Sequence, residues 1–66
     1  MGKNNLNKFR GEVMMSKAEL ARKAKVSPIT IARIENGMSC RLETMRKIIR
    51  GLGKKISDRH EIFPKD

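Results

Sequence analysis

The stretch that most constrains the fold of this chain runs from Ser16 to Gly37 and has the sequence SKAELARKAKVSPITIARIENG. Ser16 and Glu19 have the spacing of a capping box, in which each side chain satisfies a backbone N–H that the first helical turn leaves free. A short helix is therefore predicted from Lys17, and its apolar residues share one face: Leu20, Ala21 and Ala24.

A second helix is predicted almost immediately afterwards. Ser27 is a favourable N-cap, and Pro28 occupies the first helical position, where its missing N–H and fixed φ are not costly. Ile31 and Ile34 point inward one turn apart, and the Asn-Gly pair at 36–37 supplies a left-handed stop.

The connection between these two helices consists of Lys25 and Val26, followed by the Ser27 cap. Helices joined by so short a turn must cross at a steep angle, which is the helix-turn-helix arrangement. Val26 is apolar enough to fill the corner between them. The sequence therefore predicts a helix-turn-helix at about 17–36.

The residue order of this segment, A21-x3-K25-V26-S27-x3-I31-x2-I34-E35-N36-G37, resembles the helix-turn-helix of the phage Cro and repressor proteins, the XRE-type family. The likeness continues in L42-E43-T44-M45-x2-I48-x3-L52-G53, which is similar to the fourth helix of that family. The resemblance implies an all-α, lambda-repressor-like DNA-binding domain of five short helices. It also implies binding of double-stranded DNA, with the helix at about 28–36 in the major groove.

Apolar spacing predicts a helix before this segment. It begins at Asn4 or Asn5, with an asparagine as N-cap, and ends at Met14. Its buried stripe comprises Leu6, Phe9, Val13 and Met14. Gly11 inside it either weakens the helix, by about 1 kcal/mol relative to alanine, or permits a close helix crossing.

Two more helices are predicted after the segment. The first covers about Leu42 to Leu52, with Ser39 as a candidate cap and a core stripe at Met45, Ile48, Ile49 and Leu52. The second is short, Arg59 to Ile62, with Ser57 and Asp58 as candidate caps. The five methionines, Met14, Met15 and Met45 among them, are expected to fill gaps in the core, the alternative being a peptide-binding groove.

Sixty-six residues with a net charge of +9 predict one small domain that attracts polyanions. We expect residues 1–66 to form this domain, with a flexible arm at 1–4 and a flexible tail at 64–66. No apolar run approaches the roughly 18 residues of a membrane span, so a cytoplasmic, nucleoid-associated protein with no membrane partner is expected.

Catalytic and metal sites are not expected. His60 and Cys40 are the only residues of their types and lie far apart in the sequence, and no zinc or phosphate-loop motif is present. We therefore predict no enzymatic activity, cofactor or metal. Cys40 is interpreted as an inert loop thiol, with a redox switch as the alternative.

The resemblance places the DNA contacts on and around the second helix of the motif. The residues expected to contact bases are Ile29, Thr30 and Arg33, because arginine bonds guanine and an apolar side chain meets the thymine methyl. Phosphate contacts are expected from Lys17, Ser27, Asn36, Arg41 and Arg10.

In this family an arginine in the first helix pairs with the glutamate of the E-N-G ending, which implies an Arg10–Glu35 pair, the alternative being two solvated charges. Most of the later cations are expected to form a solvated face: Arg46, Lys47, Arg50, Lys54 and Lys55.

Three positions depart from the family pattern. Lys17 and Pro28 stand where glutamines are common, so the preferred operator should differ from that of relatives that bind adenine with glutamine. Lys25 stands where glycine is usual, which predicts a residue with a Cβ at φ > 0 at a cost of roughly 1 kcal/mol.

The predicted function is sequence-specific DNA binding by a small prokaryotic or phage transcriptional regulator, in particular a repressor. A homodimer, at least on DNA, is expected because one such domain makes few base contacts. Ile62 and Phe63 are expected either to contact the partner subunit or to close the core. The alternatives are an antitoxin that binds operator and toxin, a cationic protein that binds polyanions or membranes without specificity, and an interaction module that has lost base recognition.

Overall fold

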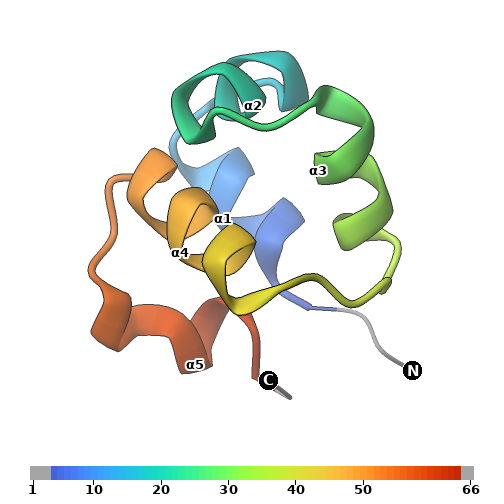
Figure 1. Ribbon diagram of the computed structural model, residues 1–66. Helices are drawn as coiled ribbons and strands as arrows, with labels where there is room; N and C mark the ends of the chain where they lie inside the picture. Colours follow the sequence, from blue (N-terminus) through green and yellow to red (C-terminus); the bar gives the residue numbers. More distant parts are fainter. Residues whose placement is uncertain (1–3, 65–66) are drawn as a thin grey trace.

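The computed structural model describes residues 4–64, and within them every predicted helix forms (Figure 1). The elements are α1 (Leu6–Glu12), α2 (Lys17–Ala24), α3 (Pro28–Glu35), α4 (Leu42–Gly51), the 3-10 helix η1 (Ile56–Asp58) and α5 (Arg59–Ile62). The predicted all-α fold with a helix-turn-helix at about 17–36 is confirmed. No helix in this part of the chain is long and apolar enough to cross a membrane.

The two helices of the motif begin where serine caps were predicted. Ser16 Oγ accepts a hydrogen bond from the Glu19 backbone N–H at 3.0 Å, and Ser27 Oγ accepts one from the Thr30 N–H at 3.2 Å. Each bond satisfies a donor that a helix start otherwise leaves free, and Pro28 has no N–H to satisfy. The caps therefore fix the first residues of α2 and α3.

The turn between α2 and α3 has the backbone conformation that the sequence predicted. Lys25 is left-handed, with φ 61° and ψ 42°, and the Val26 N–H donates to Ala21 O at 2.9 Å. This bond reverses the chain at once, so that Val26 packs against the core from the corner between the helices. After α3, Gly37 has φ 97°, which is the predicted left-handed stop.

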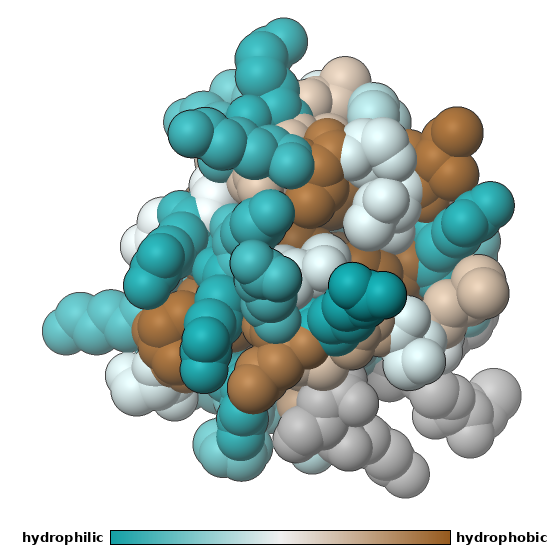
Figure 2. Space-filling view, viewed as in Figure 1, coloured by the Kyte–Doolittle hydropathy of each residue, from teal (hydrophilic) through white to brown (hydrophobic). Residues whose placement is uncertain are grey.

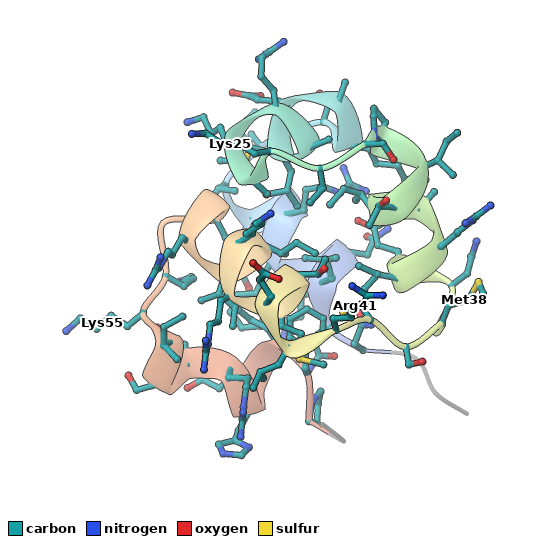
Figure 3. All side chains as sticks on the ribbon, viewed as in Figure 1. Lys25, Met38, Arg41 and Lys55 are labelled. Atoms are coloured by element: carbon teal, nitrogen blue, oxygen red, sulfur yellow. The ribbon has the colours of Figure 1, made fainter. Side chains whose placement is uncertain are left out.

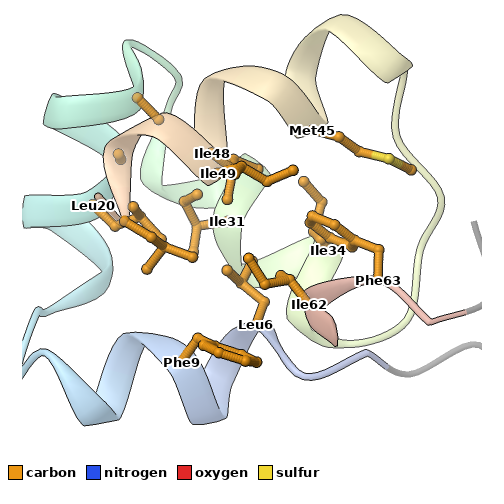
Figure 4. Packing of buried hydrophobic residues seen from close by; sticks show 13 residues of the cluster. Leu6, Phe9, Leu20, Ile31, Ile34, Met45, Ile48, Ile49, Ile62 and Phe63 are labelled. Carbon is orange, nitrogen blue, oxygen red and sulfur yellow. The ribbon is translucent and has the colours of Figure 1, made fainter. Parts of the chain in front are cut away.

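One apolar core connects all five helices (Figure 4). Leu6 and Phe9 come from α1, Leu20 from α2, Ile31 and Ile34 from α3, and the remaining large members are Met45, Ile48, Ile49, Leu52, Ile62 and Phe63. The spacing that predicted the stripes of α2, α3 and α4 is confirmed. Helix α2 packs against both α3 and α4, α1 lies against α3, and α5 closes the core beneath α4.

Helices α2 and α4 approach each other closely at Gly51. A Cβ at this position would lie 3.1 Å from Leu20 Cδ1 and 3.2 Å from both Cβ and the backbone N of Ala24. The last turn of α4 therefore lies directly on the last turn of α2. The helix ends at this point, and Gly53, with φ 79°, reverses the chain.

Helix α1 is shorter than predicted. It ends at Glu12, Val13 is 41% exposed, and Met14 is 89% exposed with φ 56°. Placing these two residues in the core was wrong, because the helical period that predicted them stops one residue earlier and the chain turns toward α2. The core position falls instead to Met15, which is partly buried. A Cβ on Gly11 would meet nothing within 4 Å, so this glycine does not serve a close crossing.

Two predictions about helix caps were also wrong, whereas the flexible arm and tail stay predictions. The arm predicted at 1–4 lies outside the described residues except for Asn4, which is held by hydrogen bonds; of the tail at 64–66 only Pro64 is described. Arg41, not Ser39, precedes α4, without a side-chain cap. Asp58 Oδ2 accepts from the Lys55 N–H and stabilises η1, so α5 begins from that 3-10 turn and not from a side-chain cap.

Candidate nucleic-acid interface

The outward face of α3 presents one exposed cation and, besides Pro28 at the first position, one exposed apolar side chain. Ile29 is 64% exposed, Arg33 is exposed one turn further on, and Thr30 is half-buried between them and the domain. Ile31 and Ile34 on the opposite face are buried in the core and hold the helix in place. The three residues predicted to contact bases therefore lie on the side of α3 that is open to a ligand.

The hydroxyl groups at the start of α3 are largely occupied by each other. Ser27 Oγ and Thr30 Oγ1 lie 3.0 Å apart and share one hydrogen bond, and Ser27 Oγ also accepts the Thr30 N–H. Because each hydroxyl has a single hydrogen, one O–H remains between the two for an outside acceptor. Thr30 and Ser27 therefore act as a unit and not as two independent contacts.

The end of α3 is tied to α1 by the predicted Arg10–Glu35 pair. Arg10 Nε lies 2.7 Å from Glu35 Oε2, and Arg10 Nη2 donates to Glu35 Oε1 at 3.2 Å, so the pair is bidentate. Arg10 Nη1 also donates to Met15 O at 2.9 Å. The side chains are 16% and 5% exposed, respectively, so both charges are largely removed from water and depend on each other. Two of the five N–H groups of Arg10 remain for an outside anion.

Two asparagines in the N-terminal segment, which sequence reasoning missed, complete this junction. Asn4 Nδ2 donates to the Ile34 carbonyl at 2.9 Å, and Asn7 Nδ2 donates to Glu35 Oε1 at 3.2 Å. Asn7 precedes Arg10 by three residues and so shares its face of α1, which was the available signal. The hydrogen bond from Asn4 spans thirty positions of the chain, and no local sequence pattern predicts it.

Apart from Arg10, the residues predicted to contact phosphate lie at helix ends. Lys17 is the first residue of α2, Ser27 caps α3, Arg41 precedes α4, and Asn36 follows α3; all four are exposed. Figure 3 shows Arg41 in the segment that joins α3 to α4, with Met38 beside the end of α3. Exposed cations and free N–H groups at helix starts favour anions.

The C-terminal pair Ile62 and Phe63 lies in the core. Their exposures are 0% and 1%, and the Asn5 N–H donates to Ile62 O at 2.9 Å, which fixes α5 against α1. Of the two roles expected for them, the structure shows the closing of the core.

The described residues do not form a group of side chains that could bind a metal ion. Residues 4–64 contain no cluster of three His, Cys, Asp or Glu side chains able to hold a metal ion. Cys40 is partly buried and packs against the core from the segment before α4. What this surface presents is a helix with exposed side chains, surrounded by cations.

A helix-turn-helix family model, HTH_3, matches residues 6–58, which is most of the chain. The chain belongs to the XRE-type helix-turn-helix family. No curated protein sequence matches the chain.

Solved structures of this family superpose well. The clp gene regulator ClgR from C. glutamicum is 27% identical, with a TM-score of 0.73 over 82% of this chain and 71% of that chain. A single-residue mutant of the controller protein C.Esp1396I, bound to its highest affinity operator site OM, is 26% identical, with a TM-score of 0.81 over 91% of this chain and 80% of that one. Wild-type C.Esp1396I, at 24% identity and a TM-score of 0.80, supports the fold alone, over 91% of this chain and 79% of that one.

Proposed function

We propose that this protein is a sequence-specific DNA-binding transcriptional regulator of prokaryotic or phage type, acting as a repressor that occupies its operator. Its main support is the outward face of α3, which presents Ile29 and Arg33 from a helix fixed at both ends. The Ser27 cap holds the start, and the Arg10–Glu35 pair holds the last turn. A rigid helix with exposed side chains is what insertion into the major groove requires.

Two exposed side chains of α3 have chemical counterparts on base edges. The Arg33 guanidinium matches O6 and N7 of guanine, and the Ile29 side chain matches the 5-methyl group of thymine. The one remaining O–H of the Ser27 and Thr30 unit serves either a base acceptor or a phosphate. We expect the operator half-site to contain guanine and thymine within the reach of one helical turn.

Phosphate contacts position the domain and carry no sequence information. We assign them to Lys17, Ser27, Asn36 and Arg41, which surround α3. Arg10 acts first by positioning α3 through Glu35, and its two remaining N–H groups are available to a phosphate. The protein acts by binding and not by catalysis.

A homodimer on DNA follows from the small number of base contacts, with half-sites about one helical turn apart. We expect the protein to be cytoplasmic and associated with the nucleoid. The neighbours named above are regulators, and neither is named as an antitoxin, so the antitoxin alternative is not favoured.

The test is selection of bound duplexes from a random library at about 150 mM salt, where non-specific attraction is weak. An enriched inverted repeat with half-sites about 10 base pairs apart is the expected result. Recovery of random sequences, with binding that disappears as salt rises, would refute base recognition.

Two variants then separate the roles of the contacts. Arg33→Ala should cost about 1–3 kcal/mol and relax the preference at one base pair. Lys17→Ala should weaken all sequences alike and reduce the salt slope by about one. Equal losses on operator and random DNA from Arg33→Ala would remove this arginine from the base-contacting set.

A further inference from the structure

A second concentration of positive charge lies away from α3, where the last turns of α2 and α4 meet. The contact at Gly51 brings these two turns together, and both carry exposed cations, as do the segments that follow them. We call this surface the α2–α4 basic face; its residues are Arg22, Lys23, Lys25, Lys47, Arg50 and Lys55. Figure 3 shows Lys25 and Lys55 on the same side of the molecule, and Figure 2 shows hydrophilic side chains gathered over that side.

One carboxylate adjoins this face, because Asp58 Oδ2 accepts a hydrogen bond from the Lys55 backbone N–H at 3.0 Å. Glu19 and Glu43 are the acidic residues of α2 and α4, and both lie in the first turns of their helices. Within residues 4–64 the one ion pair is Arg10–Glu35, which lies at the junction of α1 and α3. Six exposed cations with one adjoining carboxylate leave the face positively charged, which attracts a polyanion.

The face is also separate from the proposed operator-binding surface. In Figure 1, α3 lies on one side of the domain and the C-terminal end of α4 on the other. The domain measures 25 × 22 × 21 Å, which exceeds twice the Debye length of about 10 Å at 0.1 M salt. Two polyanions held on opposite sides are therefore screened from each other.

The chemistry of the face favours duplex DNA over a protein or a single strand. Protein interfaces depend on central apolar or aromatic anchors, and single strands are bound by stacking on exposed aromatic rings. Both phenylalanines, Phe9 and Phe63, are buried. Of the large apolar side chains that are exposed within residues 4–64, only Ile56 adjoins the face in sequence. Arginine and lysine without such anchors match the regular phosphates of a duplex.

We propose that the α2–α4 basic face is a second, sequence-independent contact for duplex DNA, so that a domain seated on one duplex by α3 also holds another DNA segment. This contact adds to the proposed function and does not depend on base recognition by α3. It assigns a function to the cations of the α2–α4 basic face, which the proposed operator contacts do not include.

A two-colour bridging assay tests the proposal. A donor-labelled 20-base-pair duplex carrying the selected operator is mixed with an acceptor-labelled random duplex and the protein at low salt, and energy transfer reports both duplexes in one complex. If selection yields no operator, both duplexes are random. The assay therefore decides about the second contact even if the proposed function fails.

Variants of matched charge give the assay its specificity. Lys23→Gln/Arg50→Gln should abolish most of the energy transfer and make the salt dependence of second-duplex binding less steep by about two, since each lost phosphate contact removes about 0.9 from the slope. Lys8→Glu, on the exposed side of α1, changes the net charge by the same amount and should leave bridging intact. Arg33→Ala should weaken the operator contact and leave the second contact unchanged.

Three results would overturn the proposal. The first is the absence of energy transfer with the wild-type protein at low salt. The second is bridging that survives Lys23→Gln/Arg50→Gln, which would assign it to two operator-binding surfaces of a dimer. The third is binding of poly-glutamate or single-stranded RNA to the face in preference to the duplex, which would assign the face to an acidic protein or to RNA.

Discussion

Lys25→Gly tests the backbone geometry of the helix-turn-helix. Lys25 holds φ 61° and ψ 42°, a conformation that costs a residue with a Cβ about 1–2 kcal/mol and costs glycine nothing. Its side chain is exposed and makes no hydrogen bond or ion pair within residues 4–64, so its removal loses little. The greater freedom of glycine in the unfolded chain offsets part of the gain.

We expect a net stabilisation of about 0.5–1 kcal/mol, which for a domain of this size raises Tm by roughly 2–8 °C. Thermal unfolding followed by circular dichroism at helical wavelengths measures the change. Lys25→Ala keeps the strained conformation without the lysine side chain and should leave Tm nearly unchanged. Lys23→Gly, two residues earlier and inside α2, should lower stability by about 1 kcal/mol.

The opposite signs at positions 23 and 25 are the decisive feature, because both changes remove an exposed lysine and introduce a glycine. A lower Tm for Lys25→Gly would refute the reasoning that the left-handed conformation at position 25 destabilises the domain. A rise in Tm for Lys25→Ala comparable to that for Lys25→Gly would attribute the effect to relief of charge repulsion and not to the backbone.

Further stability predictions concern the helix contacts and the buried ion pair. Gly51→Ala should lower Tm, because the new Cβ meets the backbone of Ala24 at 3.2 Å. Gly11→Ala should raise stability by about 0.5–1 kcal/mol, because its Cβ enters open space. The reverse order of Tm values in thermal melts would contradict the close packing of α2 and α4. Arg10→Met should cost about 3 kcal/mol in urea unfolding, because Glu35 is left buried with its charge unpaired, and Arg10→Met/Glu35→Met should recover most of that loss. If Arg10→Met/Glu35→Met is as unstable as Arg10→Met, the loss does not come from the unpaired charge of Glu35, and the reasoning is wrong.

Local signals in the sequence were sufficient to predict the helices and the motif. Ser16, Ser27 and Pro28 mark helix starts through interactions that span three residues or fewer, and they do so here. The periodic stripes of α2, α3 and α4 predicted the core because only one face of each helix can be buried. Where the period ran past the true helix end, at Val13 and Met14, the same reasoning failed.

The candidate interface was only partly accessible to such reasoning. The spacing of α3 identified Ile29 and Arg33 as outward residues, and the family pattern identified the Arg10–Glu35 pair. The mutual hydrogen bond of Ser27 and Thr30 reduces two predicted contacts to one free O–H, which follows from rotamer geometry that the residue types do not specify. Ile62 and Phe63 are buried, so the structure shows the closing of the core, one of the two roles predicted for them.

The sequence by itself determined the helix boundaries at the motif, the left-handed turn at Lys25 and the choice of side chains on α3, because capping, chirality and helical period are local effects. Only the tertiary structure decided that Asn4 and Asn7 hold the end of α3, and that the last turns of α2 and α4 lie against each other. Those arrangements depend on the close contact at Gly51 and on bonds between segments that the sequence separates by about thirty residues. The order of residues along a chain does not fix such distances until the core has packed.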